Sequence, residues 1–312
     1  MLGRKLYNDY SSHFKERFPV KMQKISIDAG FTCPNRDGEK AVGGCAYCNN
    51  QTFSPSYTNL KESVAEQVHK GIRFFGRKYK DMRYLAYFQS YTNTYASVDD
   101  LKKLYDEALS VEKVDGLVIS TRPDCLPDEV IALLSDYAEK YYVSVEVGVE
   151  SHLDRTLSAI NRAHSFAEAV DTLKRLEGSG IENCVHVVLG FPDEDINDWV
   201  KQAKLFSTLP IDTLKLHQLQ IHKGTRFAKL YADTPEAFNI LSLEDYIDIC
   251  VQYLEHLSPD IIIQRFTSQA PPDMLIAPKW GIKNYEFTAK LVKELQRRNS
   301  YQGKLFDNQL MS

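Results

Sequence analysis

Short apolar strands alternate with helical segments along most of this chain, and this alternation narrows its possible folds more than any other feature. The expected strands are rich in β-branched and aromatic residues and end in polar residues, glycine or proline. They occupy residues 24–30, 83–89, 116–121, 142–148, 184–189 and 213–219, with a seventh at 260–266. Apolar positions at helical spacing predict helices at 60–76, 98–110, 128–140, 165–178, 194–207 and 242–256.

A repeated strand–helix order places parallel strands side by side through right-handed crossovers. We therefore predict an α/β fold in which residues 24–225 form a partial (β/α)6 TIM-like barrel. A doubly wound sheet is the alternative, which periodicity does not separate from the barrel. Residues 1–23 and 226–312 are then basic N- and C-terminal extensions, the latter packed on the barrel. Ser165 and Asp193 stand where helix N-caps belong.

The N-terminus and the apolar runs exclude two classes of protein. The first nine residues, MLGRKLYND, have no apolar stretch of the kind a signal peptide needs. No apolar run approaches the roughly 18 residues that a membrane span requires. We expect a cytoplasmic protein with no membrane partner, whose cysteines stay reduced.

The net charge of −4 hides an uneven distribution. Residues 1–24 sum to +4 and residues 279–304 sum to +5, which leaves −13 for the rest. Basic ends on an acidic body suit nucleic-acid binding. They also suit the solvated faces of terminal helices, and charge alone leaves both interpretations open.

Three of the six cysteines, Cys33, Cys45 and Cys48, crowd into the loop after the first expected strand. Gly43 and Gly44 precede Cys45 and let the backbone turn tightly there. Three thiolates without a fourth nearby suit a 4Fe–4S cluster with one open iron. A zinc site would need a fourth ligand such as His13 or His69, and would make the chain a non-catalytic binding module.

With this cysteine loop the chain resembles the radical S-adenosylmethionine (radical SAM) superfamily. The stretch from Cys33-Pro-Asn-Arg-Asp-Gly to Gly43-Gly-Cys-Ala-Tyr-Cys-Asn49 is similar to the cysteine loop of a small bacterial family. That family belongs to the branch of the elongator catalytic subunit, whose cysteine loop is also expanded. The resemblance implies a 4Fe–4S cluster on the three cysteines, SAM as cofactor, and an electron donor such as flavodoxin or ferredoxin.

Further matches imply a SAM site at the strand ends. Segment 87–94 stands where the family binds the methionine amino group, and 121–124 resembles a segment of the elongator branch. Segment 146–151 resembles the ribose-contacting strand, 160–162 carries the arginine that often pairs the methionine carboxylate, and 190–194 matches Gly-x-Pro-x-Glu. The implied cofactor-binding residues are Tyr47, Gln89, Ser90, Thr92, Asn93, Arg122, Glu146, Glu150, Ser151, Arg162 and Gly190.

Some of these side chains have alternative interpretations. Glu146 and Glu150 share one face of a strand. Inside the barrel they would pair with ribose hydroxyls and Arg162, whereas outside they would be solvated. Arg122 and Asp124 would form an ion pair or touch ligand. Cys125 could reach the site, and Tyr47 would either pack near the adenine or cover the cluster.

The implied chemistry is abstraction of a hydrogen atom by a 5′-deoxyadenosyl radical. The elongator-like resemblance and the basic ends favour RNA as substrate, specifically a tRNA wobble uridine. A radical SAM enzyme acting on a small metabolite is the alternative.

Overall fold

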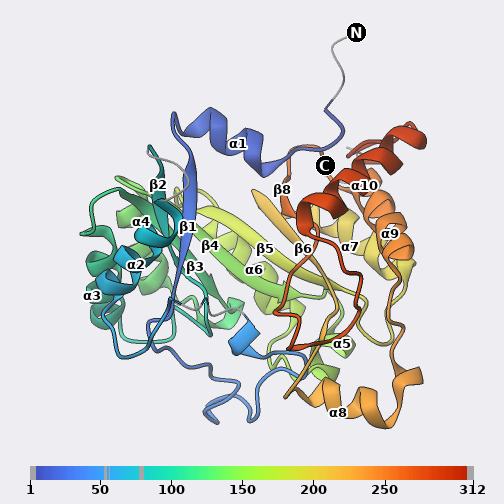
Figure 1. Cartoon of the computed structure of the whole chain (residues 1–312), viewed down its shortest axis with the longest axis horizontal. Coiled ribbons are helices and arrows are strands. Elements are labelled where there is room, and N and C mark those ends of the chain that lie inside the picture. The colour runs from blue at the N-terminus through green and yellow to red at the C-terminus, as the bar shows by residue number, and fades with distance from the viewer. Residues whose placement is uncertain (1–4, 53–54, 56, 77–80, 308–312) are drawn as a thin grey trace.

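The computed structural model describes residues 5–52, 55, 57–76 and 81–307. Seven parallel strands form one curled sheet, ordered as they follow along the chain (Figure 1). They are β1 (Met22–Ile27), β2 (Arg83–Phe88), β3 (Val114–Thr121), β4 (Tyr142–Glu150), β5 (Glu182–Leu189), β6 (Thr213–Gln218) and β8 (Ile262–Arg265). A doubly wound sheet would switch strand order near its middle, so the sequential order confirms the partial barrel.

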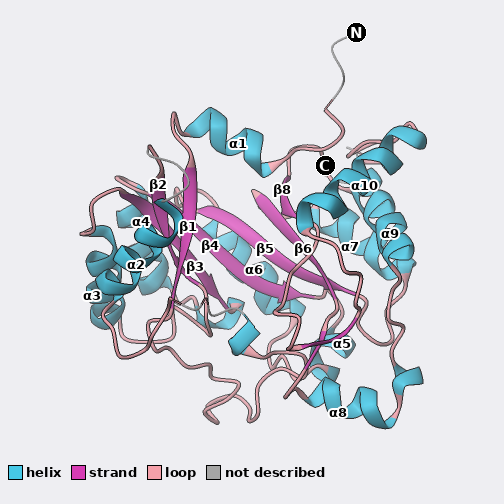
Figure 2. Cartoon of the chain, viewed as in Figure 1, coloured by secondary structure: helices cyan, strands magenta, loops and turns pink. Residues whose placement is uncertain are grey.

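Helices cover the outer face of this sheet (Figure 2). They are α2 (Val64–Gly76), α3 (Val98–Leu109), α4 (Asp128–Ala138), α6 (Phe166–Leu176), α7 (Ile196–Phe206) and α9 (Leu243–His256). In β4, the valines at 143, 145, 147 and 149 belong to the large apolar core beneath the helices. Because strand side chains alternate, Glu146 and Gly148 face the inside of the curl.

The two basic ends of the chain meet. Helix α1 (Tyr10–Arg17) packs Phe14 against Tyr142, the first residue of β4, and so covers the starts of the strands. The segments before α1 and after α10 (Asn284–Arg297) lie near each other (Figure 1). The backbone amide of Gln302 donates to the carbonyl of Leu6 at 2.8 Å. Arg4, counted with the basic N-terminus, lies outside the described residues.

Most element bounds match the prediction within about two residues, with three corrections. Helix α2 begins at Val64 rather than at residue 60, because a turn in which the amide of Glu62 donates to the carbonyl of Asn59 precedes it. Ser165 caps α6 as predicted, but Asp195 rather than Asp193 caps α7, because a turn closed by Glu194 and Phe191 delays the helix. Strand β1 ends before Asp28, whose amide is bound by the Gln67 side chain instead of a strand.

The remaining elements are short. They are α5 (Asp154–Ala159), α8 (Arg226–Asp233), the paired strands β7 (Ile221–His222) and β9 (Leu275–Ala277), and single turns at Asn50–Thr52, Pro123–Cys125 and Pro235–Ala237. Strand β8 comes from the segment expected as the C-terminal extension and pairs with β6, so the sheet continues into that segment.

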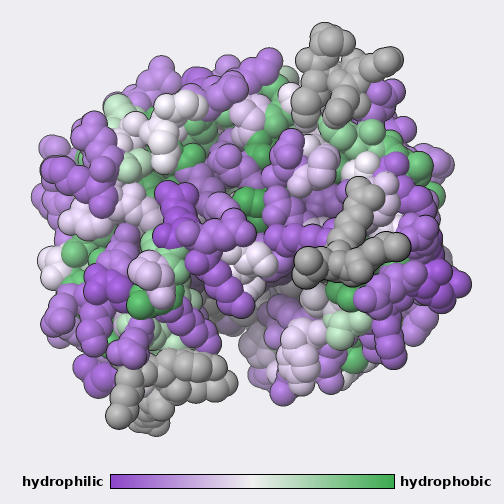
Figure 3. All heavy atoms as spheres, turned by 90° about the horizontal axis from the view of Figure 1, so that it is seen from above, coloured by the Kyte–Doolittle hydropathy of each residue, from purple (hydrophilic) through white to green (hydrophobic). Residues whose placement is uncertain are grey.

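Hydrophilic residues dominate the face seen in Figure 3, where hydrophobic residues appear in small groups. Within the described part of the chain, every helix is too short or too polar to cross a membrane.

Candidate active site

One cavity runs from the cysteine loop onto the inner face of the sheet. Its wall brings together ten of the residues predicted from the sequence: Cys33, Cys45, Cys48, Tyr47, Gln89, Thr92, Arg122, Glu146, Glu150 and Arg162. Four others, Ser90, Asn93, Ser151 and Gly190, lie outside this wall as the described residues define it. The C-terminal ends of parallel strands therefore meet the loop after β1, where a barrel enzyme keeps its site.

Two glycines shape the cysteine loop as predicted. Gly43 and Gly44 have φ angles of +82° and +76°, a left-handed conformation that disfavours other residues. A Cβ on Gly44 would lie 2.9 Å from Nε of Arg36. The Arg36 guanidinium in turn donates to the carbonyl of Cys48 at 3.1 Å, so it ties the two ends of the loop together.

Nitrogen donors point at two of the cysteine sulfurs. Asn35 Nδ2 and Arg162 Nη1 each lie 3.4 Å from Sγ of Cys45, and Asn50 Nδ2 lies 3.8 Å from Sγ of Cys48. Such N–H···S contacts stabilise thiolates and are one way in which proteins tune iron–sulfur clusters. The donor set of this loop, three thiols with N–H support, fits a cluster held by cysteine alone.

Neither histidine considered as a fourth zinc ligand lines the cavity with the loop cysteines. In the described chain, the one trio of His, Cys, Asp or Glu ligand atoms that all lie within 4.8 Å of one another is that of Glu146, Cys184 and His186. His13, weighed above as a fourth ligand, instead contacts Glu182 at the start of β5, and His69 is exposed on α2.

Arg162 lies between the cysteine loop and β4. Its Nη2 donates to the carbonyl of Gly148 at 2.6 Å and lies 3.7 Å from Oε1 of Glu150. A Cβ at position 148 would be 2.5 Å from Nη2, so a larger residue there would displace the guanidinium from this position. Arg162 Nε donates to Nε2 of His164 at 3.0 Å, which makes that imidazole neutral with its proton on Nδ1.

Glu150 faces the cavity because the strand is irregular there. Its φ is +70°, and the register between β4 and β5 shifts between Gly148 and Glu150. Such bulges re-aim side chains beside active sites. Burial raises the pKa of Glu150, and Arg162 opposes that rise. The solvated alternative for Glu146 and Glu150 is therefore wrong, since both side chains line the cavity.

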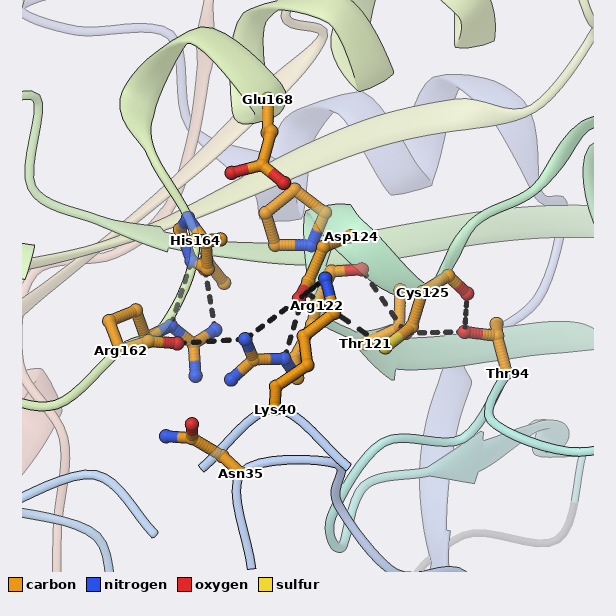
Figure 4. Close-up of polar contacts among 12 residues, drawn as sticks. Asn35, Lys40, Thr94, Thr121, Arg122, Asp124, Cys125, Arg162, His164 and Glu168 are labelled. Atoms are coloured by element: carbon orange, nitrogen blue, oxygen red, sulfur yellow. Dashed lines mark hydrogen bonds and ion pairs between the residues drawn. The ribbon is translucent and has the colours of Figure 1, made fainter. Parts of the chain in front are cut away.

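Arg122 forms the ion pair considered above (Figure 4). Its Nε and Nη2 each donate to Asp124 at 2.9 Å, and Nη2 also donates to the carbonyl of Arg162 at 2.7 Å. Although burial raises the pKa of Asp124, Arg122 and Lys40 hold it below its ordinary value. Nη1 of Arg122 is buried in the cavity wall without a partner among the described residues, so it can donate to a ligand.

Glu146 has other partners than those expected. Arg162 lies next to Glu150 and not next to Glu146. Glu146 instead contacts Lys215, Lys24 at 2.9 Å and His186 at 3.1 Å. Despite its burial, the two lysines and the hydrogen bond with His186 hold the pKa of Glu146 well below its ordinary value. Lys24, Lys215 and Arg265 were not predicted as residues of the site. Lysine inside the apolar run Thr213-Leu-Lys-Leu was the available signal, since a strand lysine must find a buried partner.

Cys125 and Ser151 occupy structural positions, whereas Tyr47 lines the cavity. Cys125, which the sequence allowed to reach the site, is buried outside the cavity wall, and burial raises its pKa to about 12. Ser151 donates to Glu194, which also accepts from Trp199 Nε1 at 2.9 Å, so this contact joins β4 to the segment after β5. Tyr47 lines the cavity with its ring 5.4 Å from that of Phe191.

Comparison with known proteins identifies the family. The model of the radical SAM superfamily matches residues 33–206, and that of the radical SAM C-terminal domain matches residues 211–297. The chain is 37% identical to the uncharacterized protein YtqA of Bacillus subtilis over 97% of its own length and 93% of that protein. It is 35% identical to the protein YhcC of Escherichia coli over 88% of each.

A solved structure shares the fold. The archaeal Elp3 of Methanocaldococcus infernus superposes with a TM-score of 0.69 at 14% identity, over 91% of this chain and 64% of that one. This chain belongs to the radical SAM superfamily. It is a radical SAM enzyme, a class that uses a 4Fe–4S cluster and SAM.

Proposed function

We propose that Cys33, Cys45 and Cys48 hold the 4Fe–4S cluster and that SAM binds beside it in the cavity. The bound cluster and SAM supply a 5′-deoxyadenosyl radical, which takes a hydrogen atom from the substrate. One observation carries the proposal: a single cavity wall contains the three cysteines, the unpartnered Nη1 of Arg122 and the inward carboxylate of Glu150.

The residues around the cysteines suit the two ends of SAM. Arg122 and Arg162 present buried guanidinium groups, which are suited to a carboxylate such as that of methionine. Glu150, on the irregular end of β4, presents an acceptor for ribose hydroxyls. Because these groups are held by Asp124, Gly148 and His164 before any ligand arrives, little reorganisation accompanies binding.

We further propose that the substrate is tRNA, at the wobble uridine. Tyr91 is 37% exposed at the cavity and the Arg36 guanidinium lies over its ring, 5.9 Å from the centroid. An aromatic ring and an arginine at a cavity mouth suit a base splayed out of a single-stranded loop. This pair is where we expect the target base to stack as it enters.

Exposed cations on the segment that packs against the cysteine loop suit an RNA backbone. Asn49, next to Cys48, donates to the carbonyl of Lys223 at 2.8 Å, and the amide of Phe227 donates to the carbonyl of Ala46 at 2.9 Å. This segment carries the exposed side chains of Lys223, Arg226 and Lys229. Helix α1 instead packs on the starts of the strands, away from the cysteines. We therefore expect RNA phosphates to meet Lys223, Arg226 and Lys229 rather than the basic N-terminus.

The modified nucleosides of tRNA test this function. A strain that lacks the gene is complemented with the wild type, with Cys45→Ala or with Cys184→Ala. We expect a wobble-uridine derivative to depend on the wild type and on Cys184→Ala, and to be lost with Cys45→Ala. Unchanged nucleosides in every strain, or equal activity of the purified enzyme on free nucleoside without tRNA binding at low salt, would favour a small metabolite instead.

A further inference from the structure

The part of the cavity wall formed by the strands has more positive than negative charge. We call this part the strand floor: Tyr87, Glu146, His186, His217 and Arg265, with Lys24 and Lys215 in contact behind it. Glu146 is its one carboxylate, and it already contacts Lys24, Lys215 and His186. Burial lowers the pKa of His186 to about 4, so this imidazole is neutral near pH 7. Glu146 therefore serves as the one acidic partner of two lysines, in an interior where unbalanced charge is unfavourable.

Arg265 lacks an acidic partner of its own. Within the described chain, no carboxylate lies within 4.0 Å of its guanidinium. Nε and Nη2 both point at Nε2 of His217, at 3.1 and 2.9 Å. Since that nitrogen must accept, His217 is neutral with its proton on Nδ1, and it neutralises none of the arginine's charge. Burial, with Arg265 second, lowers the pKa of His217 well below its ordinary value.

The pKa of Lys215 also reflects the nearby positive charges. Burial lowers its pKa to about 7 against the attraction of Glu146, and both Lys24 and Arg265 lower it further. A metal ion in the neighbouring trio of Glu146, Cys184 and His186 would add yet more positive charge to a carboxylate that two lysines already occupy. The floor is therefore suited to an anion and unsuited to a cation.

We propose that the strand floor binds an anionic group of the substrate, a carboxylate or a phosphate, through Arg265 and His217, with Lys215 behind them. A planar guanidinium with free N–H groups suits either anion. The inference rests on the proposed function, because it assigns to the substrate of that cavity the group that reaches its floor. A tRNA substrate would carry this group on the target nucleotide, since the floor lies on the strands below the mouth.

Thermal unfolding of the reconstituted holoenzyme in malonate, phosphate or chloride at equal ionic strength tests the floor without turnover. At about ten times its dissociation constant, a bound anion should raise Tm by roughly 2–4 °C over chloride. General salt effects on stability are common to all variants and cancel in their comparison. A rise with malonate alone identifies a carboxylate site, and a rise with phosphate alone identifies a phosphate site.

Substitutions and added SAM show whether the rise in Tm comes from anion binding at the strand floor. The rise should vanish in Arg265→Gln, shrink in Lys215→Gln, and persist in Arg297→Gln, which alters an exposed arginine of α10. It should also persist with saturating SAM. An equal rise in all variants, no rise above chloride, or a rise abolished by SAM would overturn the proposal. None of these readouts depends on RNA, so failure of the tRNA proposal would show itself separately in the nucleoside analysis.

Discussion

Arg162 Nη1 lies 3.4 Å from Sγ of Cys45, although 117 residues separate them in the chain. The same guanidinium also reaches Gly148 on β4 and His164. One side chain thus links the cysteine loop to the strand that carries Glu146 and Glu150. Substitutions of Arg162 and of nearby residues should change cluster assembly, SAM binding, RNA binding or stability. Each of these properties can be measured separately.

Cys45→Ala should prevent cluster assembly, because one of the three thiolates of the proposed ligand set is removed. We expect anaerobic reconstitution to give little bound iron and no 5′-deoxyadenosine. Cys184→Ala is the matched control, since Cys184 is fully buried on β5 apart from the loop. Normal iron content in Cys45→Ala would show that the ligand set is misassigned.

Arg162→Lys should weaken SAM binding at least tenfold. Lysine keeps the charge but loses the fork that bonds Gly148, His164 and Cys45 together, and charge-assisted hydrogen bonds contribute about 1.5–3 kcal/mol each. Equilibrium dialysis of SAM against the reconstituted enzyme measures the change, with Arg297→Lys as control. An unaltered SAM affinity would show that Arg162 does not contribute to SAM binding.

Lys223→Gln with Lys229→Gln should lower the salt dependence of tRNA binding. Each phosphate that the double variant no longer binds should reduce the slope of log K against log salt by about 1. The matched control is Lys290→Gln with Lys293→Gln, two exposed lysines on α10. If only the control pair changes the slope, the RNA lies on α10 rather than at the cavity mouth.

Glu146→Gln should destabilise the fold strongly. The change leaves Lys24 and Lys215 without a carboxylate in the interior, which typically costs about 3–5 kcal/mol. Lys215→Met should cost about 1 kcal/mol or less, because Glu146 keeps Lys24 and His186. Urea unfolding of both variants measures the difference in the free energy of unfolding. An equal loss of unfolding free energy in Glu146→Gln and Lys215→Met would mean that the network does not depend on Glu146 more than on Lys215.

Lys215 should also make stability depend on pH. Burial, followed by Lys24 and Arg265, lowers its pKa to about 7 from an ordinary 10.5. Between these values the unfolded chain holds the proton and the folded chain does not, so this group's contribution makes the folded state more stable as pH rises. Below pH 7 its contribution should be flat. Subtracting the unfolding free energy of Lys215→Met from that of the wild type at each pH isolates this trend, and a difference that falls from pH 7 to 10 would contradict it.

The fold was predictable because its determinants are local. Apolar alternation at 143–147 and helical spacing at 128–140 each specify an element from neighbouring residues, and their order along the chain implies parallel strands. Element ends were less certain, since Asp195 caps α7 only because the turn before it runs through Glu194. The cysteine loop could also be predicted, because Gly43, Gly44 and the three cysteines lie within sixteen residues.

The βα order, the cysteine triad and the family that both indicate could all be read from the amino-acid sequence. Which buried charges meet depends instead on the folded chain. Folding pairs Arg162 with Glu150 and Cys45, and Glu146 with Lys24 and Lys215. It leaves Arg265 against His217. These pairings join residues from 12 to 122 positions apart. They depend on strand register and on one bulge after Gly148, and no local pattern encodes either one.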